Sequence, residues 1–338
     1  MKRAVVAPAL LIVMATAVAA QQSSPSPGSK PLATSGGEVN PALFRSSTNL
    51  VPLNVTVTDG NKQFVRGLTA ADFAVFEDGI PQQVQFFEAV DVPLDLIMLL
   101  DTSSSMSDKM DVVHEAAVGF VRTLRPGDRG AVVAFADGVD ILQQLTSDRA
   151  ALEQAILKTA ARGATSLNNA LYISLKTFGR SAQQSGDVRR QAIAVLSDGE
   201  DTSSLVSFDD VLSVARKSGV SVYPIALQSK YAAARLVSSG QRRFFNESEF
   251  AMRSLAQETG AQAFFPTQIF ELKGIYASIA QELSSQYSLA YAPANARSDG
   301  RFRRILVRLI GRPELMLRTR TGYTADTSRV NAPAQQGR

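Results

Sequence analysis

One aspartate, one threonine and three serines follow an apolar run in the order Asp101-Thr102-Ser103-Ser104-Ser105. The run before them, Leu94 to Leu100, predicts a buried strand, which places these side chains at the carboxyl end of that strand. Ligands of open α/β sheets bind outside the carboxyl ends of the strands. Carboxylate and hydroxyl oxygens suit a hard cation such as Mg²⁺. The motif therefore predicts one part of a cation site.

Two further loops carry oxygen ligands of the same kind. The loop from Arg162 to Leu167 precedes a predicted helix and contains Thr165, with a glycine that permits a tight turn. The loop from Leu196 to Asp201 follows another apolar strand and contains Asp198. The candidate metal ligands are Asp101, Ser103, Ser105, Thr165 and Asp198.

The candidate set is rich in hydroxyls and poor in carboxylates. Because hydroxyls add no charge, a bound cation stays electrophilic, and an octahedral Mg²⁺ completes its shell with water or an incoming oxygen. Mn²⁺ or Ca²⁺ could take the same place. An Asp or Glu of a protein partner is the natural incoming group, so the set predicts binding of such a partner through the metal.

The amino-acid composition excludes several kinds of catalytic site. The chain has no Cys and a single His, His114, which excludes thiol nucleophiles and disulfides and argues against a Ser-His-Asp triad. Haloacid-dehalogenase-like phosphatases need a carboxylate two residues after the nucleophilic Asp, and here that position is Ser103. We therefore expect no enzyme, with a metal-dependent hydrolase as the least favoured alternative.

The length and net charge of the chain limit the number of domains and the class of partner. With 338 residues the chain can hold one large domain or two ordinary ones, and 45% hydrophobic residues suffice for a core. The formal charge of +4 is too weak to indicate nucleic acid as a partner.

The middle of the chain, residues 93–286, alternates strands and helices, which predicts a doubly wound, mostly parallel sheet covered on both faces. The predicted strands are residues 94–101, 131–136, 141–145, 192–196, 221–227 and 261–265. The predicted helices are residues 108–124, 148–160, 168–178, 208–218, 249–259 and 269–286.

The flanking segments, residues 49–92 and 287–325, have strand patterns and are each too short to fold alone. In the first, Phe73–Phe76 and Val84–Phe87 are predicted to be strands joined by the turn Glu77-Asp78-Gly79. The simplest arrangement pairs the two segments in one small antiparallel β domain. The alternative is two separate appendages.

The termini have compositions of their own. Residues 1–20, with Lys2 and Arg3 before an apolar stretch, are typical of a signal peptide, or alternatively an uncleaved anchor. No other apolar run is long enough to span a membrane. Residues 21–48 and 326–338 are predicted to be a disordered linker and tail. The sequence therefore predicts export to the periplasm or the cell exterior.

The three loops together resemble the metal-ion-dependent adhesion site of von Willebrand factor type A (VWFA) domains. The resemblance covers about Leu94 to Gln286, and it implies that Ser103 and Ser105 bind the metal directly. It also implies that Thr165, Asp101 and Asp198 bind directly or through water. The flanking stretches Leu68–Phe73 and Arg320–Tyr323 resemble a bacterial VWFA-related family common in Acidobacteria.

Three further features of the sequence have more than one possible role. Glu200 and Asp201 either shape the rim of the site or belong to a solvated loop. Seven arginines form either a solvated hairpin face or an anion-attracting surface: Arg301, Arg303, Arg304, Arg308, Arg312, Arg318 and Arg320. The segment 230–248 is predicted to be a long loop bordering the metal face. The favoured function is an exported adhesion module, and the alternative is an envelope component that acts through the β domain.

Overall fold

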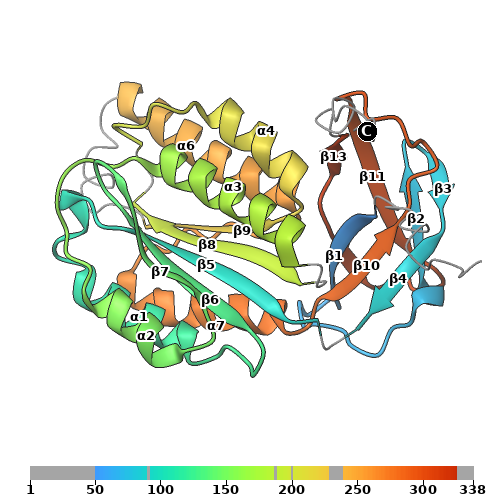
Figure 1. Ribbon diagram of the computed structural model, residues 1–338, viewed down its shortest axis with the longest axis horizontal. Coiled ribbons are helices and arrows are strands. Elements are labelled where there is room, and N and C mark those ends of the chain that lie inside the picture. The colour runs from blue at the N-terminus through green and yellow to red at the C-terminus, as the bar shows by residue number, and fades with distance from the viewer. Residues whose placement is uncertain (1–49, 90–91, 186–188, 199–200, 228–238, 326–338) are drawn as a thin grey trace, which may run out of the picture. The chain divides into compact units, whose positions relative to one another are not determined.

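The computed structural model describes residues 50–89, 92–185, 189–198, 201–227 and 239–325, which lie in one compact unit. The predicted signal peptide, linker and tail lie outside these residues. The chain forms an α/β layer structure with a five-stranded sheet, together with two four-stranded antiparallel sheets (Figure 1). The predicted fold class is confirmed.

The central sheet has the strand order β7-β6-β5-β8-β9, and only the edge strand β7 is antiparallel. Its strands are β5 (Leu94–Asp101), β6 (Arg129–Phe135), β7 (Val139–Thr146), β8 (Arg190–Ser197) and β9 (Ser221–Ala226). Every residue of β5 is buried, as expected for a parallel strand covered on both faces. The chain continues from β5 to β6 on one side and later to β8 on the other, so the winding direction reverses at β5.

Two helical layers cover this sheet (Figure 1). One layer holds α1 (Met110–Val121), α2 (Arg149–Leu157) and α7 (Leu272–Leu283), and its apolar side chains join Leu96, Met98 and Leu100 of β5 in one core. The other holds α3 (Leu167–Ser185), α4 (Phe208–Ser218) and α6 (Ser239–Thr259), which pack on Ile97 and Leu99. Alternate residues of β5 therefore serve the two faces.

The segments on either side of the α/β region pair with each other, as predicted. The first sheet has the order β12-β1-β10-β4 and the second β13-β11-β2-β3. The N-terminal strands are β1 (Val51–Thr58), β2 (Phe73–Glu77), β3 (Ile80–Gln82) and β4 (Val84–Glu88). The C-terminal strands are β10 (Tyr287–Tyr291), β11 (Phe302–Leu309), β12 (Met316–Arg318) and β13 (Gly322–Thr324). Between the sheets, the rings of Phe73, Phe87 and Tyr287 lie 5.3–5.9 Å apart.

A buried polar cluster joins the β sheets to the α/β region. The Glu282 carboxylate of α7 is 2% exposed and accepts hydrogen bonds from the hydroxyls of Thr56 (3.2 Å) and Tyr223 (3.0 Å). The guanidinium of Arg318 pairs with the same oxygen. Strands β1, β9 and β12 and helix α7 thus meet at one carboxylate.

Several predicted elements need correction. β2 pairs with the short strand β3, whereas Val84–Phe87 belongs to β4 in the other sheet, because the tight turn at Asp78 and Gly79 leads straight into β3. The strand predicted at 261–265 is a single bridge from Phe264 to Ile225. Helix α6 begins ten residues before its predicted start, at Ser239, so much of the predicted loop 230–248 is helical. The part of that segment between 230 and 238 lies outside the described residues.

The arginine run is not one solvated face. Arg303 is buried because alternate residues of the antiparallel strand β11 point inward, and Arg320, in the segment between β12 and β13, is buried as well. Arg303 pairs with the buried Glu77 at 3.3 Å. Arg301, Arg304, Arg308 and Arg312 are exposed.

Candidate functional site

The candidate ligands lie on three loops at the carboxyl edge of the central sheet. The parallel register sets Leu100 of β5 beside Leu196 of β8, so the next residues of the two strands, Asp101 and Ser197, are neighbours. The Ser197 hydroxyl donates a hydrogen bond of 2.6 Å to Oδ2 of Asp101. The end of β8 therefore fixes the carboxylate at the end of β5.

The first loop turns back on Asp101. The Ser103 N–H donates to Oδ1 of Asp101 at 2.8 Å, and the hydroxyl oxygens of Ser103 and Ser105 lie 3.0 Å apart. A short 3-10 turn, Ser104–Met106, starts directly after Ser103 and buries Met106, which anchors the loop in the core. Asp101 and Ser103 are buried and Ser105 is exposed, so the hydroxyl pair leads from the interior to the surface.

The second loop, which contains Thr165, is hydrogen bonded to the first loop and to the turn that follows β6. The Ser104 N–H donates to the Gly163 carbonyl at 3.0 Å, and the Ala164 N–H donates to Asp137 at 2.8 Å. Gly163 has a φ of +72°, and a Cβ there would lie 2.0 Å from an Asp137 oxygen. The tight turn predicted from this glycine is therefore present, and only glycine fits it.

The third loop supplies Asp198 and also holds Thr165. The Thr165 carbonyl accepts from the N–H groups of Thr202 (2.9 Å) and Ser203 (3.0 Å), and the Thr165 N–H donates to the Thr202 hydroxyl (3.0 Å). Asp201, predicted to lie in a solvated loop or at the rim, accepts from the Asn168 N–H at 2.9 Å at the start of α3. Glu200 lies outside the described residues.

The electrostatics at this edge favour a cation. Burial raises the pKa of Asp101, hydrogen bonds from Ser103 and Ser197 lower it, and the charge of Asp198 raises it again, with a net increase. Lys109 brings a positive charge to this edge, with its ammonium 3.8 Å from the Asp198 carboxylate and 2.7 Å from the Ser105 carbonyl. These three charged groups together keep one negative charge, which a bound cation would offset.

The donor set fits a hard cation that needs few carboxylates. Two carboxylates and three hydroxyls supply only oxygen, the ligand type of Mg²⁺, Mn²⁺ and Ca²⁺. Among the residues that the structure describes, no group of three or more His, Cys, Asp or Glu side chains could hold a metal. Any cation at the carboxyl edge would therefore depend on the hydroxyls of Ser103, Ser105 and Thr165.

Sequence reasoning missed Ser197 and Lys109. Ser197 precedes the predicted ligand Asp198 in a parallel strand, and pairing its strand with β5 would have placed it beside Asp101. Lys109 stands eight residues after Asp101, and its charge near a predicted cation site was the available signal. The single histidine, His114, is half-buried on α1 and hydrogen bonds to the Thr159 hydroxyl at 2.7 Å, away from the candidate ligands.

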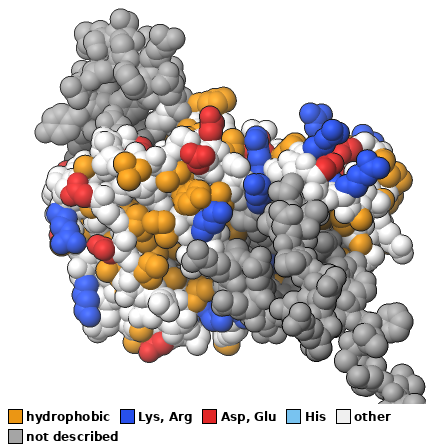
Figure 2. Space-filling model, turned by 45° about the horizontal axis from the view of Figure 1, so that its top comes forward, with side chains coloured by type: hydrophobic (Ala, Val, Ile, Leu, Met, Phe, Trp, Pro, Cys, Tyr) orange, Lys and Arg blue, Asp and Glu red, His pale blue; other side chains and the backbone are white. Residues whose placement is uncertain are grey.

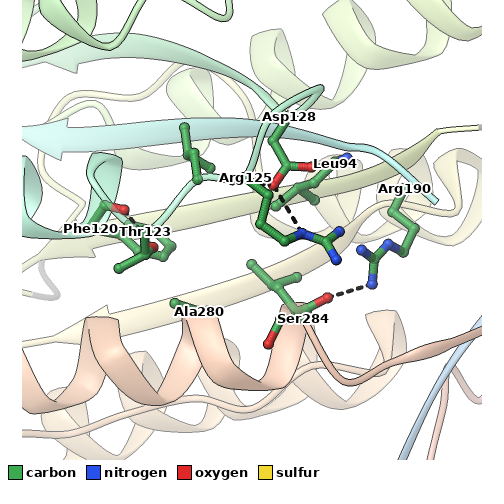
Figure 3. Close-up of a pocket in the computed structure, with 10 residues that line it drawn as sticks. Leu94, Phe120, Thr123, Arg125, Asp128, Arg190, Ala280 and Ser284 are labelled. Atoms are coloured by element: carbon green, nitrogen blue, oxygen red, sulfur yellow. Dashed lines mark hydrogen bonds and ion pairs between the residues drawn. The ribbon is translucent and has the colours of Figure 1, made fainter. Parts of the chain in front are cut away.

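A small cavity lies at the opposite, amino end of β5, beside Leu94 (Figure 3). Its volume is about 30 Å³, which is room for water rather than for a substrate. Arg190 projects into it from β8, and burial lowers the pKa of this guanidinium to about 10, with the charge of Arg125 adding to the effect. Arg190 donates to the carbonyls of Val92 and Leu283, so its role there is to tie chain segments together.

Comparisons with known proteins agree with this architecture. The model of the von Willebrand factor type A domain matches residues 95–258. A UPF0353 protein of Mycobacterium leprae is 24% identical over 202 residues, and one of Mycobacterium tuberculosis is 23% identical. Each match covers 56% of this chain and 60% of the relative, so the chain spans about 60% of the length of these relatives.

Solved structures with a similar arrangement include a von Willebrand factor type A protein from Catenulispora acidiphila. It has a TM-score of 0.46 and 17% identity, covering 62% of this chain and 49% of that one. The vWF domain of the type V pili tip protein Mfa5 from Porphyromonas gingivalis has a TM-score of 0.45 and 15% identity, covering 58% and 96%. No helix among the described residues is long and apolar enough to cross a membrane.

Proposed function

Because residues 95–258 form a von Willebrand factor type A domain, we propose that the carboxyl edge of its sheet is a cation-dependent binding site for a protein partner. The ligands would be Asp101, Ser103, Ser105, Thr165 and Asp198, and the cation Mg²⁺, or Mn²⁺ or Ca²⁺ in its place. When bound, the cation would supply an electrophilic position that accepts an Asp or Glu oxygen of the partner.

One observation carries the proposal: the Asp101 carboxylate is fully buried, yet its charge is only partly compensated. Oδ1 accepts a hydrogen bond from the Ser103 N–H and Oδ2 accepts one from the Ser197 hydroxyl, and both of these donors are uncharged. A buried carboxylate is costly without further compensation. The adjacent hydroxyls of Ser103 and Ser105 open towards the surface, so a cation held here is within reach of a partner.

Binding is favoured over catalysis by the same residues. No general acid or base stands at position 103, because a serine hydroxyl does not exchange protons near neutral pH. Asp101 and Ser103 hold their oxygens in the interior, and the hydroxyl of the exposed Ser105 lies at the surface of the site. The proposed role is therefore recognition and adhesion, performed outside the cytoplasm after export through residues 1–20.

Thermal unfolding of the full chain tests the cation site. We expect Mg²⁺ or Mn²⁺ at about 100 times its Kd to stabilise the protein by about 2.7 kcal/mol, which raises Tm by roughly 4 °C over an EDTA control. Asp101→Ala should lose the shift, whereas Asp209→Ala, an exposed carboxylate on α4, should keep it. An equal Tm with Mg²⁺ and with EDTA in the wild type would refute the proposal.

A pull-down tests the partner. Wild type should capture a protein in Mg²⁺ and release it in EDTA, and Asp101→Ala should capture none. Capture that persists in EDTA and in Asp101→Ala would instead indicate docking through the β domain, which is the alternative function.

Edman sequencing of the secreted protein tests export. If residues 1–20 are removed as a signal peptide, we expect the mature chain to begin near residue 21.

A further inference from the structure

Residues 201–206, which follow β8, are hydrogen bonded to the start of α3. Asp201 accepts one hydrogen bond from the Asn168 N–H at 2.9 Å and another from the Ser204 N–H at 3.0 Å. The Ser204 hydroxyl in turn accepts from the Asn169 N–H at 3.1 Å. The loop thus caps the helix, whose free N–H groups need acceptors, and the helix fixes the loop.

An exposed leucine stands on this hydrogen-bonded segment. The side-chain oxygen of Asn169 accepts from the N–H groups of Leu205 (3.2 Å) and Val206 (3.1 Å). Val206 packs against the core on the α3 side of the sheet. The Leu205 side chain, in contrast, is 95% exposed. Its backbone is therefore fixed while its whole apolar surface faces solvent.

Leu205 lies beside the candidate cation site. The Ser203 N–H is 3.0 Å from the carbonyl oxygen of Thr165, a proposed ligand. Two residues of chain span at most about 7 Å, so the Leu205 backbone lies within about 10 Å of that carbonyl oxygen. A peptide segment of a few residues with its carboxylate in the site is long enough to span that distance.

A second apolar side chain continues the surface along α3. Ile173 follows Asn169 by four residues, so the two share one helix face, and Ile173 is 41% exposed. In Figure 2, which turns the layer of α3, α4 and α6 toward the viewer, hydrophobic side chains gather over the helices. A single exposed leucine is ordinary on a protein surface. A fixed one near a binding site, with apolar surface behind it, is suited to contact a partner.

The charges at the site indicate a second property of the partner. Lys109, 16% exposed, contributes a positive charge beside Asp198, and together with a bound cation it would favour the approach of an acidic group. We propose that Leu205 is the specificity contact of the site, and that the partner is a protein segment in which an Asp or Glu is accompanied by an aliphatic or aromatic side chain at a fixed spacing. This inference rests on the proposed cation-dependent function.

Synthetic heptapeptides provide the test. Each carries a central Asp among Ser and Gly residues, and a single Leu is placed at each other position in turn, with one all-polar peptide as reference. Binding of the full chain is measured in Mg²⁺ and in EDTA for wild type, Leu205→Ser and Leu157→Ser. Leu157 on α2 is 59% exposed and serves as the matched control. Thermal unfolding of each variant checks that it folds.

We expect wild type and Leu157→Ser to prefer Leu at one spacing from Asp by roughly tenfold or more, because burying a leucine side chain is worth that much. Leu205→Ser should lose the preference and keep Mg²⁺-dependent binding of the all-polar peptide. An unchanged preference in Leu205→Ser, or none in wild type, would overturn the Leu205 proposal alone. Absence of Mg²⁺-dependent binding for every peptide would overturn the proposed function, and this inference with it.

Discussion

The Lys109 ammonium lies 3.8 Å from the Asp198 carboxylate, and it also donates to the carbonyl of Ser105 at 2.7 Å. Both partner residues, Asp198 and Ser105, are proposed to bind a cation. The lysine therefore brings a positive charge to the place where a metal ion would add two more. It lowers the cost of the buried carboxylates in the metal-free protein and opposes the arrival of the cation.

Replacing this lysine should strengthen cation binding. For Lys109→Met we expect Mg²⁺ affinity to rise about fivefold, the equivalent of about 1 kcal/mol between unit charges 4 Å apart in water. Isothermal titration calorimetry measures the change, and added salt should reduce it. Lys158→Met, an exposed lysine after α2, is the control and should bind as wild type does. Weaker binding by Lys109→Met would mean that the lysine supports the site instead of opposing the cation.

The turn at Gly163 should be intolerant of a side chain. Its positive φ and the 2.0 Å approach of a Cβ to Asp137 predict that Gly163→Ala lowers the free energy of unfolding by roughly 1–3 kcal/mol. Displacing Asp137 also frees the Ala164 N–H and shifts neighbouring Thr165, so cation affinity should fall as well. In the nearby control Gly138→Ala, a Cβ would meet no atom within 4 Å, and little change is expected. Urea unfolding and calorimetry measure the two effects, and equal behaviour of the variants would contradict the prediction.

The polar cluster at Glu282 should stabilise the contact between the β sheets and the α/β region. Glu282→Ala removes the buried carboxylate oxygen that accepts from Thr56, Tyr223 and Arg318 together. We expect a loss of roughly 3–5 kcal/mol in the free energy of unfolding, as for other broken buried pairs. The control is Glu153→Ala, which breaks an exposed pair with Arg122 and should cost far less than Glu282→Ala. Similar losses in the two variants by urea unfolding would argue against a buried, connected cluster.

Glu258 should make stability depend on pH. Burial raises the pKa of Glu258, but hydrogen bonds from Arg216 and Thr321 outweigh it, and the net pKa lies below its usual range. Because folding lowers this pKa, the stabilisation is complete above the unfolded value of about 4.3 and disappears as pH falls through the folded value. Glu258→Gln should therefore be less stable than wild type by about 1 kcal/mol at pH 7, with the difference shrinking below pH 4. Urea unfolding between pH 3 and 7 gives the comparison.

The exposed residue Glu115 provides the control for that series. Glu115→Gln removes a carboxylate from α1 without such partners, and its stability should follow wild type across the same pH range. A Glu258→Gln difference that stays constant down to pH 3 would show that the ionised carboxylate is not the stabilising form.

Most of the α/β layers could be predicted from local patterns. The strand Leu94–Asp101 and the helix Phe208–Ser218 have the predicted bounds, and Gly219 ends that helix with a φ of +72° as its C-cap. A continuous apolar run and a helical repeat closed by glycine are local signals, which neighbours do not alter. The helix α6 was predicted too short, because its first turns are polar and lack the apolar repeat.

Which strands pair with each other was harder to predict than the strands themselves. The hairpin of β2 closes on the three-residue β3, and β4 pairs with β10, about two hundred residues away in the chain. Strand pattern indicates which face is buried but not which strand lies alongside. The same limit applies to Arg303, whose burial depends on Glu77 from a distant strand.

The sequence by itself determined the type of fold, the pairing of the two flanking segments as the simplest arrangement, and the three loops that carry oxygen ligands. These follow from periodicity, from segment length and from residue type, all of which are properties of the chain. Only the tertiary structure decided that Ser197 holds Asp101, that Lys109 reaches Asp198 and that Leu205 projects from a fixed loop. These relationships arise from strand register and from hydrogen bonds between distant loops, which exist only once the sheet has formed.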